Sequence, residues 1–227
     1  MISTDFDEVK SEYEKFYPSS PFFDTWVPRE KFLSAEFCGE GNISISREDD
    51  GIYGMAIGSS PVIPSEWKNF SLDSRAVAPL PQEFKAVVEW DCYWAQTKSG
   101  EPVAEQLSTD SDISAFLKIH APDSSVFPGN DEIVQWVEVR NDDDLLAVAA
   151  LCRWESGRIV ISSVATRTDM RGQGLGKQLM EKCLIAGHAL GEWYLSLGVR
   201  HQNESAQRLY RATGFTLMHN FTYCERR

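Results

Sequence analysis

The sequence has no uninterrupted apolar run of about 18 residues, the length that a membrane-spanning helix requires. It is also poor in cysteine, with five widely spaced thiols that form neither a CxxC pair nor a Cys/His cluster of zinc spacing. The amino-terminal segment MISTDFDEVKSEYEKF is polar and acidic, unlike a secretory signal. We therefore expect a cytoplasmic protein with free thiols, no bound metal and no membrane association.

Neither of two familiar glycine-rich nucleotide motifs is complete. Gly172, Gly174 and Gly176 stand at alternate positions directly before the amphipathic run LGKQLMEKC. A dinucleotide fold uses GxGxxG in an early strand-to-helix turn, whereas this GxGxG lies late in the chain. A P-loop places Ser or Thr after its Gly-Lys pair, but Gly176-Lys177 is followed by Gln178. The pattern thus argues against both classes of nucleotide-binding site.

A third kind of site fits the glycine segment. A helix N-terminus without side chains presents free backbone N–H groups, which bind a phosphate-bearing ligand. Each such contact is worth about 0.3–1 kcal/mol, and several converge at one helix end. Arg171 and Lys177 add fixed positive charge beside the glycines. The sequence therefore predicts an anion site formed by Arg171, Gly172, Gly174, Gly176 and Lys177.

The net charge of −12 is spread unevenly. Residues 151–227 contain 11 Lys and Arg against 6 Asp and Glu, a net charge of +5, whereas residues 1–150 contain 11 against 28, a net charge of −17. A basic carboxyl-terminal third suits an anionic ligand. The acidic remainder repels nucleic acid and attracts small cations or cationic peptides, unless it serves only solubility.

Periodicity and turn residues predict an α/β chain in two parts. We expect an α+β region over residues 1–100, with strands at 52–58 and 84–96 among loops rich in Pro and Ser. Its helix at 5–17 carries Phe6, Val9, Tyr13 and Phe16 on one apolar stripe. A polar linker at 100–112 opens a second domain, 101–227. The expected elements of this domain are a helix (113–120), three strands (134–140, 145–154, 158–166) with an acidic turn (141–144) after the first, a helix ending near 188, a strand (193–199), a helix (203–213) and a last strand (215–224).

One internal echo is visible. REDDGIYGMAI (47–57) and RNDDDLLAVAA (140–150) share an arginine, acidic residues and a small/apolar alternation. Acidic hairpin turns are common, so coincidence is one explanation. The other is that the amino-terminal region is a degenerate copy of the second domain's sheet, without a glycine segment.

Two blocks of the sequence match the conserved motifs of one known protein family. The pyrophosphate motif of that family is Arg or Gln, two residues, Gly, one residue, then Gly or Ala, which Arg171, Gly174 and Gly176 match in order. A second block, LGVRHQNESAQRLYRATGF, matches the family at Asn203, Ala206, Leu209-Tyr210 and Gly214-Phe215. On these two blocks the chain resembles the GNAT superfamily of N-acetyltransferases, and the resemblance covers about Ile113 to Cys224. It implies an α/β fold with a mixed central sheet flanked by helices, to which the first hundred residues add an extension.

The resemblance also implies a reaction, the direct transfer of an acetyl group from acetyl-CoA to a primary amine. The glycines would leave bare amides for the coenzyme pyrophosphate, and the backbone of Val164 and Thr166 would bond the pantetheine arm between two diverging strands. Tyr210 matches the general acid that protonates the leaving thiolate, or else is a core aromatic. Asn203 either contacts the coenzyme or caps a helix. A small cationic amine is the favoured acceptor.

The general base is not assigned. An alkylamine with a pKa of about 10.4 is less than about one part in a thousand neutral at pH 7, so a base or a water relay is expected. The strand RIVISSVAT lacks the Glu or His that some GNAT members carry there. Glu155, His120 and His201 are candidates, each with a turn, loop or surface role as its alternative.

Several alternatives stay open at this point. The donor is an acetyl or a larger acyl group, and the acceptor a small amine or a protein amine. A different class of function is an acyl-CoA-binding module without turnover, but an intact Tyr210 argues against it. The alternating Trp90, Cys92 and Trp94 indicate core packing or, as the second interpretation, a wall of the acceptor pocket.

Overall fold

The computed structural model describes residues 1–103, 106–141 and 144–227, which form two compact units. Unit 1 comprises Met1–Cys92, Val199–Gln202 and Leu217–Arg227, and unit 2 comprises Tyr93–Gly198 and Asn203–Thr216. The chain therefore passes between the units several times. The last strand contributes nearly all of its length to the unit that contains the amino terminus, which the sequence did not suggest.

Unit 2 is a mixed α/β unit whose strands follow the order β6-β10-β9-β8-β7. Strand β8 pairs antiparallel with β7 and β9, and β10 runs parallel to β9. Its elements are the end of β6 (Phe84–Gln96), α3 (Asp110–His120), β7 (Ile133–Arg140), β8 (Leu145–Arg153), β9 (Ile159–Thr166), a 3-10 turn η2 (Thr168–Met170), α4 (Leu175–Ala189), most of β10 (Tyr194–Arg200) and α5 (Glu204–Ala212). Each element predicted for this region is found within a few residues of its expected limits.

Two expectations reach beyond the described residues. The predicted linker 100–112 includes residues 104–105, and the predicted acidic turn 141–144 includes residues 142–143. The last three residues of the predicted linker are helical, because Thr109 caps α3 through a capping box with Asp112.

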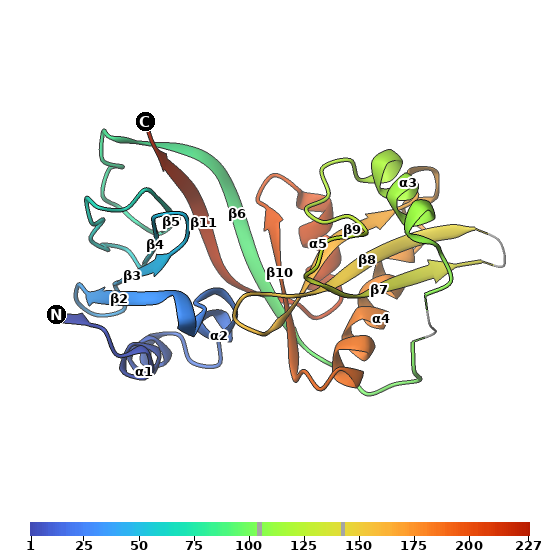
Figure 1. The fold of residues 1–227 in the computed structure, drawn as a ribbon, viewed down its shortest axis with the longest axis horizontal. Coiled ribbons are helices and arrows are strands. Elements are labelled where there is room, and N and C mark those ends of the chain that lie inside the picture. Colours follow the sequence, from blue (N-terminus) through green and yellow to red (C-terminus); the bar gives the residue numbers. More distant parts are fainter. Residues whose placement is uncertain (104–105, 142–143) are drawn as a thin grey trace. The chain divides into compact units, whose positions relative to one another are not determined.

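The apolar run of β8 is explained by helices on both sides of the strand. Figure 1 shows α3 and α4 on opposite sides of β7–β9. One side packs side chains of α3 against alternate residues of the strands (Ile113, Phe116, Leu117, Trp136, Val148, Ala150, Cys152, Val160, Ala165). Helix α4 packs against β7, β8 and β9. A strand covered on both faces loses the usual polar alternation.

Unit 1 has a sheet of the order β1-β2-β3-β4-β5-β11-β6, in which β4 and β5 are parallel. Its elements are β1 (Ile2–Ser3), α1 (Phe6–Phe16), α2 (Phe22–Trp26), a 3-10 turn η1 (Arg29–Lys31), β2 (Phe32–Phe37), β3 (Ile43–Glu48), β4 (Ile52–Ile57), β5 (Asn69–Asp73), the start of β6 and β11 (Thr216–Arg226). Elements β1, α2, η1, β2, β3 and β5 were not predicted. They are short, and the Pro- and Ser-rich segments around them carry no clear periodicity.

Helix α1 follows its predicted stripe only in part. Asp5 caps it by accepting hydrogen bonds from the backbone N–H groups of Asp7 and Glu8. Val9 and Tyr13 are fully buried in the core of unit 1, but Phe16, expected on the same stripe, is 41% exposed.

The two units share a strand pattern that the sequence echo does not capture. In each unit, three antiparallel strands precede a fourth that is parallel to the third: β2-β3-β4 then β5, and β7-β8-β9 then β10. The echo aligns the β3–β4 hairpin with the β7–β8 hairpin. The first of these is the second hairpin of the pattern in unit 1, whereas the other is the first hairpin of the pattern in unit 2. The echo thus aligns hairpins at unequal positions of the two units, and the interpretation of the amino-terminal region as a degenerate copy stays a prediction.

Candidate active site

The amino terminus of α4 is open. Its N-cap is Gly174, and no side chain caps this end, whereas Asp5, Thr109 and Asn203 cap α1, α3 and α5. The first helical bond joins the Gln178 N–H to the Gly174 carbonyl at 3.0 Å. The N–H groups of the three preceding residues therefore have no carbonyl partner within the helix. Arg171 and Lys177 are exposed beside this end.

Two different physical requirements explain why glycine occupies positions 172, 174 and 176. Gly172 and Gly174 have φ angles of 80° and 82°, and a Cβ on either would meet nothing within 4 Å. Their positions demand a left-handed backbone beside open space. Gly176 has no positive φ, but a Cβ there would lie 2.9 Å from Leu209 Cδ2 of α5. Gly176 therefore has a packing role between α4 and α5, in addition to the ligand role that the sequence suggested.

Strands β9 and β10 are paired over a short stretch only. Their parallel ladder consists of Ser196 opposite Val160 and Leu197 opposite Ile161. The rest of β9 to Thr166, which includes the predicted coenzyme positions Val164 and Thr166, has no partner in β10 in this ladder. Such a short ladder fits two strands that diverge.

A bulge interrupts β9 just beyond that ladder. Ala150 of β8 pairs with Ser162 and Val148 pairs with Ala165, so two residues of β9, Ser163 and Val164, lie opposite one residue of β8. Ser163 has a φ of 51°, rare for a residue with a side chain. Its hydroxyl accepts a hydrogen bond from the Val126 N–H at 3.0 Å and donates one to the Val126 carbonyl at 2.8 Å.

Tyr210 lies on α5 and is 5% exposed. Its ring centroid lies 6.1 Å from that of Tyr93 and 6.0 Å from that of Phe215. Within the described chain, its hydroxyl has no hydrogen-bond partner. Burial raises the pKa of the Tyr210 phenol well above its usual value, and the nearby Cys183 thiol acts in the same direction. The phenol therefore stays protonated at neutral pH.

Asn203 is the N-cap of α5. Its Oδ1 accepts a hydrogen bond from the Ala206 N–H at 3.2 Å and one from the Ser205 hydroxyl at 3.0 Å. The capping role, one of the two predicted for this residue, is present. Coenzyme contact by its amide group stays a prediction.

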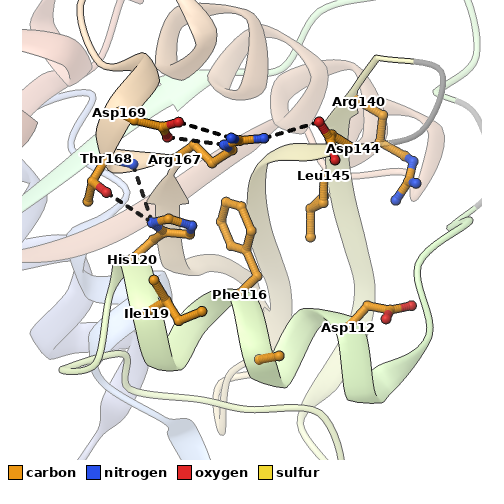
Figure 2. Close-up of a pocket in the computed structure, with 11 residues that line it drawn as sticks. Asp112, Phe116, Ile119, His120, Arg140, Asp144, Leu145, Arg167, Thr168 and Asp169 are labelled. Carbon is orange, nitrogen blue, oxygen red and sulfur yellow. Dashed lines mark hydrogen bonds and ion pairs between the residues drawn. The ribbon is translucent and has the colours of Figure 1, made fainter.

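His120 ends α3 and contacts the segment that leads to the glycines. Its Nδ1 accepts a hydrogen bond from the Thr168 N–H at 3.3 Å and lies 3.2 Å from the Thr168 hydroxyl, as Figure 2 shows. Burial lowers the pKa of His120; Asp169 opposes this shift, and Arg167 and Arg171 reinforce it. The neutral imidazole thus connects α3 to the turn before Arg171.

A cavity of about 600 Å³ lies beside α3 (Figure 2). It is lined by Asp112, Ala115, Phe116, Ile119, His120, Arg140, Asp144, Leu145, Arg167, Thr168 and Asp169. Arg167 spans part of it, with ion pairs to Asp169 at 2.9 Å and to Asp144 at 3.2 Å. Of the residues singled out in the sequence, only His120 lines this cavity.

The remaining candidates lie elsewhere. Glu155 is exposed in the turn before β9, at the opposite end of that strand from the glycines. In unit 1, His201 Nδ1 lies 3.1 Å from a carboxylate oxygen of Asp91, which is 1% exposed. Trp90 and Cys92 belong to the core of unit 1, and Trp94 packs on Trp193 in unit 2, which supports the core interpretation of this trio.

Sequence reasoning missed two features of these sites. Ser163 was not singled out, since a positive φ at a serine leaves no mark in the sequence. The pairing of Asp91 with His201 was also missed, because the residues lie on strands distant in sequence. In the part of the chain that the structure describes, no group of three His, Cys, Asp or Glu is placed to hold a metal ion, and no helix is long and apolar enough to cross a membrane.

Comparison with known proteins adds an independent line of evidence. The model of the Acetyltransferase (GNAT) family matches residues 89–215, a range that contains the glycine segment, β9, β10 and α5. Among curated proteins, none matches this sequence.

Solved structures share the fold at low sequence identity. A GCN5-related N-acetyltransferase from Kribbella flavida matches with a TM-score of 0.52 and 17% identity, over 85% of this chain and 88% of that one. A GNAT-family acetyltransferase from Colwellia psychrerythraea matches with a TM-score of 0.51 and 13% identity over 100% of both chains. A functionally unknown conserved protein from Staphylococcus epidermidis matches with a TM-score of 0.52 and 10% identity, over 92% of this chain and 98% of that one.

Proposed function

The chain belongs to the GNAT acetyltransferase family and is an acyltransferase, and we propose that it moves an acetyl group directly from acetyl-CoA to a primary amine. The observation that carries this proposal is the uncapped amino terminus of α4 beside the diverging strands β9 and β10. We propose a small cationic amine as the acceptor, because residues 1–150 carry a net charge of −17.

The residues present fit the coenzyme. The free N–H groups at the start of α4 suit a pyrophosphate, and the positions of Gly172 and Gly174 leave the space beside them open. Arg171 and Lys177 would add charge attraction. In our proposal, the backbone at Val164 and Thr166 holds the pantetheine arm along the part of β9 that lies beyond the β10 ladder.

Acetyl-CoA supplies an activated thioester, and the protein orients the amine and handles the protons. The transfer forms a carbon–nitrogen bond and breaks the carbon–sulfur bond. The proton lost by the amine goes to a base or a water relay, and Tyr210 donates its phenolic proton to the leaving thiolate. Burial of the phenol keeps that proton in place until transfer.

The setting of the reaction is part of the proposal. We assign the transferase chemistry to residues 101–227 and a supporting role to residues 1–100. We propose a cytoplasmic location without nucleic-acid or membrane partners, which the five free cysteines and the acidic charge support.

Thiol release measured with acetyl-CoA and a panel of amines tests the function. The panel contains putrescine, spermidine, lysine and a lysine-containing peptide, with propionyl-CoA as a second donor. Release that depends on a small amine supports the proposal. Thiol release with the peptide alone would indicate a protein amine as the acceptor instead of a small amine. Faster release from propionyl-CoA than from acetyl-CoA would indicate a larger acyl group as the donor. Tight coenzyme binding in calorimetry without release from any amine would indicate a binding module.

A further inference from the structure

Ser163 combines backbone strain with a bonded, buried hydroxyl. Its φ of 51° is costly for a residue with a side chain, and the residue is 9% exposed. Both backbone groups of Val126 bond its hydroxyl. Strained residues that the surrounding structure holds in place concentrate at functional sites.

A second contact attaches the same segment of chain to the same strand end. His120, which lies six residues before Val126 in the sequence, accepts a hydrogen bond from the Thr168 N–H at 3.3 Å through its Nδ1 (Figure 2). Residue 120 is therefore hydrogen-bonded to residue 168, and residue 126 is hydrogen-bonded to residue 163. The segment 120–126, which we name the anchored segment, accordingly runs antiparallel to residues 163–168.

The anchored segment lies on the α3 side of the sheet. Val126 is 6% exposed and packs in one core with Phe116 of α3 and Ala165 of β9. The stretch of β9 that it follows contains Val164 and Thr166, to which the proposed function assigns the pantetheine arm. Inside the segment, the Ser124 hydroxyl donates a hydrogen bond to the Ala121 carbonyl at 2.8 Å, which stabilises its own turn.

We propose that Ser163 is a positioning residue for the acceptor amine. By bonding Val126, it fixes the anchored segment to β9, and the segment then forms a rigid wall of the acceptor site on the α3 side of the coenzyme strand. This inference rests on the proposed function. Because a small displacement of a positioned reactant is costly to a transfer reaction, the wall must be held as tightly as the strand it faces.

Substitutions at Ser163 separate the hydroxyl from the backbone strain. Ser163→Gly relieves the strain and removes both hydrogen bonds, whereas Ser163→Ala removes the bonds and keeps the strain. Ser163→Cys retains a side chain of similar size with weaker hydrogen bonds, and serves if the glycine variant does not fold. The matched control is Ser162→Ala, which deletes the neighbouring hydroxyl, a partner of the Cys152 thiol, and leaves Val126 attached.

The expected result is a selective loss of acceptor binding. With spermidine as the amine, Ser163→Gly and Ser163→Ala should each raise the acceptor KM by about tenfold, as loss of hydrogen bonding to the wall predicts. Ser163→Cys should recover part of the loss, and Ser162→Ala should retain the wild-type KM. The acetyl-CoA dissociation constant should change by less than about twofold, since the coenzyme contacts are left in place.

Hydrogen exchange supplies a readout that does not need turnover. The Val126 amide, protected by the Ser163 hydroxyl, should exchange faster in Ser163→Gly and Ser163→Ala than in the wild type. Faster exchange with an unchanged acceptor KM would overturn the positioning role, and unchanged exchange would overturn the anchor itself. If wild-type protein neither binds acetyl-CoA nor releases thiol with any amine, the proposed function fails, whatever the exchange shows.

Discussion

The same strand pattern ends in a parallel pair in each unit, β4–β5 in unit 1 and β9–β10 in unit 2, but the two pairs differ in the length of their ladder and in the segment that connects their strands. Four consecutive residue pairs join β4 to β5, from Tyr53–Asn69 to Ala56–Leu72, but only two join β9 to β10. The β4–β5 connection contains no helix, whereas α4 with its open end connects β9 to β10. The same strand pattern therefore ends in a longer ladder in unit 1 and, in unit 2, in a short ladder beside an uncapped helix end, where we propose that the coenzyme binds.

A tryptophan fills unit 1 beside its parallel pair. Trp67, just before β5, is fully buried, and a Cβ on Gly54 of β4 would lie 2.1 Å from its ring. The indole N–H donates a hydrogen bond to the Ser46 hydroxyl at 2.8 Å. Trp67 thus occupies the space beside the parallel pair, and its ring packs in one core cluster with Ala56 of β4 and Phe70 of β5.

The largest effect that we expect is a loss of stability when Trp67, beside the β4–β5 pair, is truncated. Trp67→Ala should lower the free energy of unfolding by about 3–5 kcal/mol, since it removes a large buried side chain. Denaturant unfolding measures this loss, and Trp67→Phe should cost less. Calorimetry should show unchanged acetyl-CoA affinity in the folded variant. A fall in that affinity with the fold intact would contradict the purely structural role of this pair.

A substitution of Gly174, the N-cap of the helix that connects β9 to β10, tests the proposed coenzyme site. Gly174→Glu should weaken acetyl-CoA binding by about 100-fold or more, because a side chain at positive φ and a negative charge both oppose the pyrophosphate at the helix end. The matched control is Gly157→Glu. Gly157 also has a φ of 82° with open space around it, but it lies in the turn between β8 and β9.

Calorimetry compares the two glycine variants directly. Equal backbone strain in both makes thermal stability fall by a similar amount, so only coenzyme affinity should distinguish them. Wild-type affinity in Gly174→Glu would show that the coenzyme binds elsewhere. An equal loss in Gly157→Glu would show that the effect comes from strain.

Much of unit 2 could be predicted from the sequence because its signals are local. The apolar run of β8, the glycines before α4 and the Asn203 cap each lie within a few neighbouring residues. Long-range contacts set the rest. Nothing near Gly176 in the sequence reveals that Leu209 packs against it, and nothing near Ser163 reveals its bonds to Val126. In unit 1, short strands among Pro-rich loops gave too little periodicity for β2, β3 and β5 to be predicted.

Helix α5 provides the next test, since no helix follows β5 in the described part of unit 1. If Tyr210 protonates the thiolate, Tyr210→Phe should lower kcat by about 100-fold with acetyl-CoA affinity unchanged. Tyr93→Phe is the control, because it removes the neighbouring hydroxyl, which accepts a hydrogen bond from Arg211 at 2.9 Å. Steady-state kinetics should show a much smaller fall in kcat for that variant. Equal turnover by Tyr210→Phe and the wild type would reduce Tyr210 to packing.

The smallest expected effect separates the two roles of Asn203 at the start of α5. Asn203→Ala should cost about 0.5–2 kcal/mol of stability, since it removes the acceptor of the Ala206 N–H, and Asn203→Ser should restore most of that loss as a capping residue. If the side chain only caps, acetyl-CoA affinity stays near the wild-type value in both variants. A weaker affinity in Asn203→Ser, despite recovered stability, would instead show that the amide contacts the coenzyme. The helices after β9 and β10 would then both bind the ligand, whereas among the described residues of unit 1 no helix follows β4 or β5.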